Sequence, residues 1–173
     1  MAKKPATKKA AHDAFIKNAA EAAQKSEART GVPASVTIAQ AILESGWGEH
    51  HMGDANNYFG IKAQEKGGKI VFGDVATGFV ERLTKEFDKN GKAFTIVAHF
   101  RAYKDMAGSF IDHGIFLQSN ARYRKALDAY ATSKDANEFA RGLQKAGYAT
   151  DPNYADLLIS LMKKNDLYQF NAE

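Results

Sequence analysis

The sequence predicts an α+β domain with two lobes, one mainly helical and one built on a small β-hairpin. Three observations support this: helical periodicity at both ends of the chain, an alternating apolar pattern between them, and a length of 173 residues that suits one domain. A chain of this size buries about 68–70% of the surface that its unfolded form exposes, so it needs no metal or disulfide for stability.

The first part of the chain predicts a basic tail and two helices. Residues 1–9 contain four lysines and are expected to form a flexible tail, before a helical pattern over 10–29. Pro33 suits the start of a second helix, which runs to Ser45 with almost no polar face and is therefore expected to be buried all round. Gly46 and Gly48 are expected to end this helix.

The middle of the chain predicts the β-lobe, at about residues 66–103. A hairpin is expected over 79–103, with Asn90-Gly91 in its turn. Because side chains alternate along a strand, three residues share one side of the outgoing strand and three share the other. The first set is Leu83, Lys85 and Phe87, and the second is Thr84, Glu86 and Asp88.

After Tyr103 the helical period returns. Apolar stripes predict helices near residues 105–118, 121–131, 134–146 and 152–166. The last is expected to open with Asp151 as its cap and Pro152 at its first helical position. Residues 10–173 are thus expected to form one domain.

The composition excludes several kinds of site. The chain has no cysteine, so a disulfide framework, a cysteine-ligated metal and a thiol nucleophile are excluded. His50 and His51 are adjacent, and no HExxH motif accompanies them, so we expect no metal and no cofactor. The sequence also lacks a phosphate-binding loop and a GxSxG nucleophile motif.

The charge bears on partners and location. Lys and Arg number 24 against 20 Asp and Glu, which favours polyanionic partners such as nucleic acid, anionic lipid or a bacterial cell wall. No helix-turn-helix, RRM or zinc-finger pattern supports nucleic acid, so we expect none. No secretory apolar segment and no stretch of about 18 apolar residues is visible, so we expect synthesis in the cytoplasm without a signal peptide, no membrane insertion, and a monomer.

Two carboxylates are candidates for acid–base chemistry. Glu44 lies in the last turn of the most apolar helix, where burial and the negative end of the helix dipole both favour its protonated form. A carboxyl of that kind suits a general acid, although Glu44 pointing to solvent is the competing interpretation. Glu86, on the hairpin, is the natural second carboxylate for cleavage of a glycosidic bond, with Glu81 and Asp88 as competitors. Trp47, Tyr58 and Phe59 follow Glu44 and suit either a core or a sugar-stacking surface.

Several ordered segments resemble the bacterial glucosaminidase domain, family 73 of the glycoside hydrolases. The resemblance rests on Ala41–Gly48 (AILESGWG) and Asn57–Lys62 (NYFGIK), and covers roughly residues 12–165. It continues in order through four shorter segments, FRAY at 100–103, Asp112-His113 with Phe116-Leu117, Asn120 with Arg122-Tyr123, and AGYATDP at 146–152 with Tyr154.

The resemblance implies a lysozyme-like α+β fold with a groove between the lobes, and cleavage of the β-1,4 bond after N-acetylglucosamine in peptidoglycan glycan strands. It implies that Glu44 is the catalytic acid, that Glu86 in Thr84–Phe87 is the second acidic residue, and that Tyr148 is an active-site tyrosine. The expected substrate-binding residues are Trp47, Asn57, Tyr58, Phe59 and Gly60. The spacing of the carboxyl groups, which would separate retention from inversion, stays open.

The cellular role has several interpretations. A compact catalytic domain without a visible signal peptide or wall-binding repeats favours a phage endolysin. Such an enzyme acts on the cell wall, in the periplasm or outside the cell, after release. A secreted antibacterial effector and an autolysin share the same chemistry. A non-catalytic wall-binding or assembly module is the alternative outside enzymes.

Overall fold

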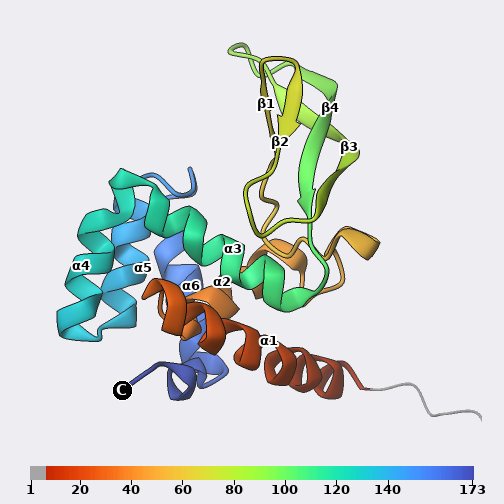
Figure 1. The fold of residues 1–173 in the computed structure, drawn as a ribbon. Coiled ribbons are helices and arrows are strands. Elements are labelled where there is room, and N and C mark those ends of the chain that lie inside the picture. Colours follow the sequence, from red (N-terminus) through yellow and green to blue (C-terminus); the bar gives the residue numbers. More distant parts are fainter. Residues whose placement is uncertain (1–6) are drawn as a thin grey trace, which may run out of the picture.

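The computed structural model describes residues 7–173 and has a helical lobe from which a β-lobe projects (Figure 1). The order of elements is helix, helix, two strand pairs and four further helices. The helices are α1 (Lys8–Thr30), α2 (Ala34–Ser45), α3 (Met106–Ser119), α4 (Arg124–Ser133), α5 (Ala136–Lys145) and α6 (Tyr154–Lys164). Short 3-10 turns η1 (Gly53–Ala55), η2 (Ala121–Tyr123) and η3 (Leu167–Phe170) join or follow them. The predicted α+β class is confirmed.

The first helix begins earlier than the sequence predicts. Thr7 caps α1 by accepting a hydrogen bond from the amide of Ala10, so Lys8 and Lys9 belong to the helix. Lys9 also pairs with Asp13 one turn later. The predicted tail over 1–9 is therefore wrong for Lys8 and Lys9, and residues 1–6 lie outside those the structure describes.

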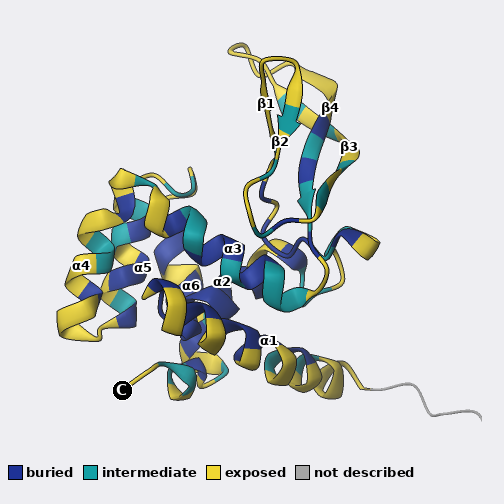
Figure 2. Ribbon diagram, in the orientation of Figure 1, coloured by how far each residue is buried: buried dark blue, intermediate teal, exposed yellow. Residues whose placement is uncertain are grey.

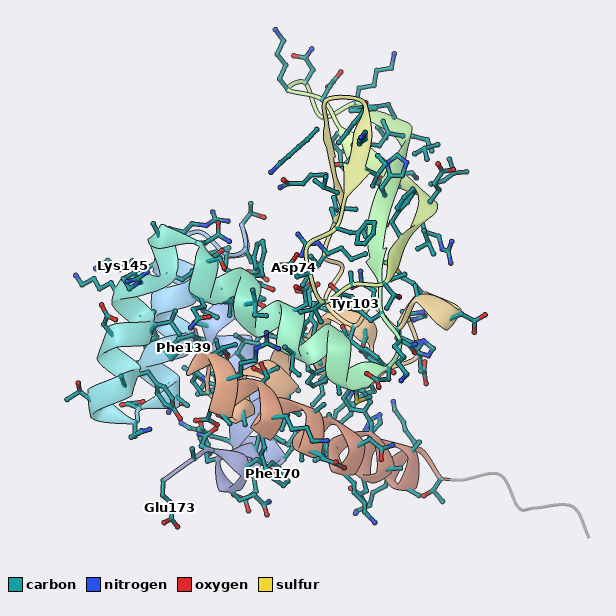
Figure 3. The ribbon with its side chains drawn as sticks, viewed as in Figure 1. Asp74, Tyr103, Phe139, Lys145, Phe170 and Glu173 are labelled. Carbon is teal, nitrogen blue, oxygen red and sulfur yellow. The ribbon has the colours of Figure 1, made fainter. Side chains whose placement is uncertain are left out.

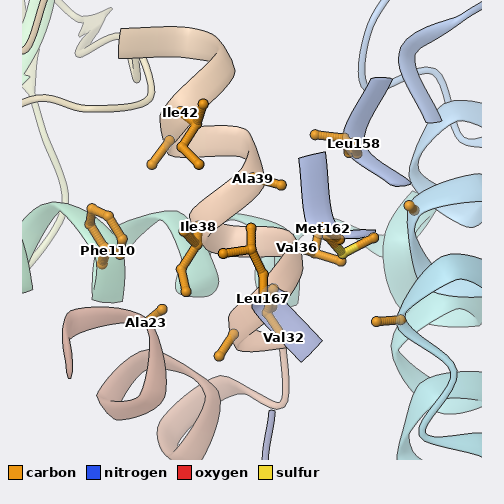
Figure 4. Packing of buried hydrophobic residues seen from close by; sticks show 14 of the residues in the cluster. Ala23, Val32, Val36, Ile38, Ala39, Ile42, Phe110, Leu158, Met162 and Leu167 are labelled. Atoms are coloured by element: carbon orange, nitrogen blue, oxygen red, sulfur yellow. The ribbon is translucent and has the colours of Figure 1, made fainter. Parts of the chain in front are cut away.

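Helix α2 forms the centre of the hydrophobic core. Its side chains Val36, Ile38 and Ile42 are surrounded by residues from other helices, among them Phe110 of α3 and Leu158 of α6 (Figure 4). Every residue from 34 to 42 is buried, which confirms the predicted burial for most of the helix. The last turn differs, because Leu43 and Glu44 are exposed.

The start of α2 is held by side chains from elsewhere. Pro33 precedes the helix rather than occupying its first position, and it offers no side-chain hydrogen bond. The amide of Ala34 instead donates to Glu27 of α1 at 2.9 Å, and the amide of Ser35 donates to the side-chain oxygen of Asn171 at 2.8 Å. These contacts satisfy donors that a helix N-terminus leaves free.

The β-lobe consists of two antiparallel strand pairs, β1 (Gln64–Lys66) with β2 (Lys69–Val71), and β3 (Gly78–Phe87) with β4 (Ala93–Ala102). The second pair confirms the predicted hairpin. Its loop is closed by Asp88, whose side chain accepts hydrogen bonds from the amides of Asn90 and Lys92, and by Gly91 in the left-handed region. Figure 2 shows that this lobe is largely exposed, whereas the buried residues gather among the helices.

The last helices are displaced slightly from the predicted ranges. Residues 121–123 form the turn η2 before α4, and Lys134 adopts a left-handed conformation between α4 and α5. Asp151 and Pro152 precede α6 rather than opening it. Asp151 accepts from the amide of Asn153 at 2.8 Å, so it shapes the turn before a helix that begins at Tyr154.

Candidate active site

A groove of about 590 Å³ lies where the foot of the β-lobe meets α3 and the ends of α2 and α5. Its lining combines aromatic rings with two carboxylates and three cationic side chains. The lining residues are Glu44, Phe59, Gly60, Ile61, Lys62, Gln64, Arg101, Asp112, Ile115, Phe116, Ser119, Asn120, Arg122, Tyr123 and Tyr148.

Glu44 reaches the groove from the last turn of α2. Gly46, in the left-handed conformation, ends the helix, and its amide bonds to the carbonyl of Ile42. Glu44 is therefore exposed to the groove instead of buried in the core. The surrounding groove walls nevertheless withdraw it from water, and this burial raises the pKa of Glu44 above its ordinary value of 4.5. The position at the negative end of the helix dipole acts in the same direction.

Tyr148 lies beside Glu44 in the groove lining. The turn after α5 positions it, since Gly147 is left-handed and the amide of Tyr148 bonds to the carbonyl of Leu143 at 3.0 Å. Its ring stacks on Tyr154 with centroids 5.5 Å apart. Burial, then the neighbouring Tyr154 and the charge of Glu44, raises the pKa of Tyr148 well above its ordinary value. The hydroxyl therefore stays protonated and can donate a hydrogen bond.

Phe59 and Gly60 form another part of the groove wall. The Phe59 ring stacks on the His113 ring with centroids 4.0 Å apart, and meets Phe110 edge-on at 5.0 Å. His113 is fully buried, and this burial lowers its pKa to about 3, so it supports Phe59 as a neutral ring. The structure thus places two of the five predicted substrate-binding residues in the groove.

The structure places the other three away from the groove lining. Trp47 stacks flat on His12 of α1, with centroids 3.6 Å apart. Tyr58 is buried and packs against Phe15 and Phe110. Both rings pack between α1 and the loop after α2, and their contact with substrate stays a prediction.

Asn57 has a structural position. It is 1% exposed, and its amide donates to the carbonyls of Ile61 and Arg101 at 3.0 and 2.9 Å. Its side-chain oxygen accepts from the amides of Phe59 and Ile61. Asn57 therefore fixes the loop that carries Phe59 and Gly60 instead of facing the groove itself.

Glu86 lies on the hairpin, outside the groove lining. Its carboxylate pairs with the ammonium of Lys62 at 3.3 Å and accepts from the hydroxyl of Thr84 at 3.4 Å. Lys62 does line the groove, so Glu86 is one side chain away from it. The competitors are placed differently, since Glu81 pairs with His99 at 3.2 Å and Asp88 accepts from backbone amides in the hairpin turn.

Sequence reasoning missed a buried network at the foot of the hairpin. Asp112 of α3 pairs with Arg101 of β4 at 2.9 Å and accepts from the hydroxyl of Tyr103 at 2.5 Å. Arg101 also donates to the carbonyl of Lys62. In Figure 3 the labelled Tyr103 lies where the hairpin joins the helical lobe. The network thus ties the two lobes together beside the groove.

Arg122 belongs to one of the segments that resemble the family, but the sequence predicts no role for it; in the structure it lines the groove next to Tyr123. No charge spacing marks a role for it, and the groove lining around it combines the nearby Asn120 and Tyr123 with the distant Glu44. Within residues 7–173, no group of three or more His, Asp and Glu side chains is placed to hold a metal ion. Within the same residues, no helix is both long and apolar enough to cross a bilayer.

The comparisons with known proteins agree with this geometry. Residues 20–167 match the family Glucosaminidase, described as mannosyl-glycoprotein endo-beta-N-acetylglucosaminidase. The chain is 39% identical to peptidoglycan hydrolase FlgJ of Pseudomonas aeruginosa over 165 residues, 92% of this chain and 38% of that protein. It is 37% identical to exo-glucosaminidase LytG of Bacillus subtilis, over 79% of this chain and 45% of that protein. The chain therefore spans less than half the length of these relatives.

Solved structures show the same fold. The catalytic domain of the autolysin Auto from Listeria monocytogenes superposes with a TM-score of 0.77 at 27% identity, covering 99% of this chain and 91% of that one. The glycoside hydrolase domain of FlgJ from Salmonella typhimurium superposes with a TM-score of 0.68 at 34% identity, covering 90% and 97%. The lysozyme-like architecture is thereby confirmed, and the chain belongs to the glucosaminidase family.

Proposed function

We propose that this chain is a peptidoglycan hydrolase that cleaves the β-1,4 bond after N-acetylglucosamine within glycan strands. The observation that carries the proposal is Glu44, a carboxyl with a raised pKa that opens into a groove beside Tyr148. Family membership and relatives named as peptidoglycan hydrolases support the substrate class. No cofactor takes part in the proposed reaction.

Glu44 acts as the general acid. In its protonated form it donates its proton to the departing glycosidic oxygen as the bond to the anomeric carbon breaks. Within residues 7–173, Glu44 has no ion pair, so no cation holds it in the charged form. The Tyr148 hydroxyl, which stays protonated, donates a hydrogen bond that orients the N-acetyl group or the attacking water.

Glu86 is the second carboxylate of the proposal. It either stabilises the positive charge that develops on the sugar ring or activates the attacking water. Its placement on the hairpin, next to the groove residue Lys62, favours it over Glu81 and Asp88. The choice between these two roles, and with it between retention and inversion, depends on the separation of the two carboxyl groups in the complex with substrate.

The experiment that tests the proposal compares Glu44→Gln with the wild type on purified sacculi. We expect a loss of about 10²–10⁴-fold in the release of reducing ends, since one general acid contributes that much. The thermal transition should remain cooperative, because the substitution removes no contact of the core. Glu49→Gln is the matched control, since Glu49 is exposed and outside the groove lining.

A wild-type rate for Glu44→Gln would refute the assignment of the acid. Mass spectrometry of the wild-type products identifies the new reducing sugar, which should be N-acetylglucosamine. Because one relative is named an exo-glucosaminidase, end-labelled glycan strands should be used to measure whether cleavage starts inside the strand, as we expect, or at its end. Binding to sacculi without any new reducing ends would favour the wall-binding module instead.

The endolysin, effector and autolysin roles remain predictions from the sequence. Each places the proposed reaction at the cell wall. Expression in the cytoplasm, alone and with a membrane-permeabilising holin, tests the endolysin role, for which lysis should require the holin.

A further inference from the structure

The charges around the groove are matched except at two residues. Of the three cationic residues in its lining, Lys62 pairs with Glu86 at 3.3 Å and Arg101 pairs with Asp112 at 2.9 Å. Arg122 has no carboxylate within 4.0 Å among residues 7–173. The groove thus contains one acid without a cation, Glu44, and one cation without an acid, Arg122.

Arg122 is held in place by its neighbour. Its guanidinium carbon lies 4.9 Å from the centroid of the Tyr123 ring, and Tyr123 is fully buried. Asn120, just before it, donates from its side chain to the carbonyl of Phe116 at 2.7 Å, which anchors the turn η2 to α3. A guanidinium that stacks on a ring retains its edge donors for a bidentate contact with a carboxylate.

Arg122 lies in the same groove as the proposed acid, Glu44. The Tyr123 ring is 6.1 Å from the Tyr148 ring, and the charge of Glu44 acts on Tyr148. Arg122 is therefore linked to the proposed acid through two adjacent rings of the same groove. A glycan strand bound along this groove would meet both Glu44 and Arg122, because both line it.

We infer that Arg122 binds a carboxylate on the muramic acid residue beside the cleaved bond, and so selects substituted glycan strands over neutral ones. The inference rests on the proposed function. In peptidoglycan this carboxylate has two sources, the lactyl ether of the sugar when it is free and the acidic residues of the peptide attached to it. Both are the planar, bidentate partner that a guanidinium matches.

The test removes the charge from the enzyme and from the substrate separately. Wild type, Arg122→Gln and Arg122→Lys are compared on three substrates: intact peptidoglycan, strands freed of peptide by an amidase, and those freed strands with their lactyl carboxyls converted to methylamides. We expect Arg122→Gln to lower kcat/KM about 10–100-fold on strands that carry the recognised carboxylate, mainly through KM, since a hydrogen bond to a charged group is worth about that factor. On the neutral strands wild type and Arg122→Gln should be equal.

Matched controls separate recognition from folding. Arg124→Gln removes a charge two residues away, outside the groove lining, and should leave all three rates unchanged. Arg122→Lys should recover part of the rate on charged strands, since lysine keeps the positive charge but lacks the paired N–H donors of the guanidinium.

The outcomes distinguish the peptide carboxylate from the lactyl carboxylate, and failure of the inference from failure of the proposed function. A loss on peptide-bearing strands alone assigns the peptide carboxylate, because there the lactyl carboxyl is bound in an amide. A loss on the amidase-freed strands alone assigns the lactyl carboxylate, and a loss on both charged substrates shows that Arg122 binds either one. An equal loss on all three substrates, or no loss on any, overturns the inference. If the wild type cleaves none of the three, the proposed function itself fails.

Discussion

Glu44 combines two properties that usually exclude each other. It is exposed, so a substrate can reach it, yet the groove walls raise its pKa by burial. The end of α2 explains the combination, because the helix leaves the core one turn before Gly46 ends it. A carboxyl buried within the core would be protonated but unreachable.

The raised pKa of Glu44 predicts how stability depends on pH. The folded chain holds this proton more tightly than the unfolded chain, so the Glu44 contribution to the free energy of unfolding falls as pH rises from 4.5 through the folded pKa. Glu44→Gln stays neutral and avoids that loss. We expect the variant to be more stable than the wild type at about pH 8, by less than about 1 kcal/mol because solvent screens the exposed group.

Urea denaturation at about pH 8 and about pH 3 measures this difference, which should disappear at the acid pH, where the wild-type carboxyl is also protonated. A gain of equal size at both values would show that packing, not charge, is responsible. The same titration predicts an alkaline limb in the wild-type rate of hydrolysis, since the general acid must hold its proton.

At the level of single residues, the sequence named Glu44 and Phe59, which line the groove, and also Trp47 and Tyr58, which lie outside its lining. Their rings suit a sugar platform and a core equally, and only the packing of α1 distinguishes the two. Arg122 was noted only as part of a family segment. Its role depends on the absence of a partner carboxylate within residues 7–173, and ion pairs between distant segments cannot be read from spacing.

Helices α1 and α3 approach each other closely along the helical lobe. The hydroxyl of Ser26 on α1 donates to the carbonyl of Phe110 on α3 at 3.0 Å. At Gly114 of α3, an added Cβ would lie 2.5 Å from Oγ of Ser26 and 2.6 Å from Oγ1 of Thr30. The absence of a side chain at Gly114 therefore permits this crossing.

Gly114→Ala should destabilise the fold, although alanine favours a helix by about 1 kcal/mol over glycine. The crowding forces α1 and α3 apart, and overpacking costs about 1–3 kcal/mol. Gly108→Ala in the same helix is the control, since its Cβ would meet Tyr103 at an ordinary 3.5 Å. Urea unfolding of both variants should show a loss for Gly114→Ala only, and a stabilised Gly114→Ala would contradict the close crossing.

Most elements followed from local pattern. The Asn90-Gly91 dipeptide predicted the hairpin turn, and the glycines after Ser45 predicted the end of α2. The alternation of side chains along the hairpin could not show which of its two sides is covered. The side with Leu83 and Phe87 is the open one, with exposures of 75% and 65%. Helix starts shifted slightly for local reasons at α1, where Thr7 is the cap, and for distant ones at α2, where Glu27 bonds the amide of Ala34.

For the molecule as a whole, Glu27 joins four segments. It is 6% exposed, and its carboxylate accepts from the Tyr130 hydroxyl of α4 and the Ala34 amide of α2, both at 2.9 Å. It also accepts from the amide of Ala172 near the end of the chain at 3.2 Å. One α1 side chain thus connects α2, α4 and the C-terminal segment.

Glu27→Ala should therefore lower the free energy of unfolding by about 1.5–3 kcal/mol, the range for hydrogen bonds to a charged group. Tyr130→Phe removes only one of the three donors and should cost less, about 1 kcal/mol. Chemical denaturation measures both values, with one slope of unfolding free energy against denaturant concentration used for the wild type and both variants. A Glu27→Ala variant as stable as the wild type would show that the carboxylate contributes no net stability.

The contact between Asn171 and the start of α2 has a practical consequence. The far end of that helix carries Glu44, and the C-terminus emerges on the side of the helical lobe away from the hairpin (Figure 1). A fusion partner joined directly after Glu173 would pull on Asn171 and disturb its contact with the first turn of this helix. An affinity tag at the C-terminus therefore requires a long spacer, so that Glu44 at the other end of the helix keeps its position.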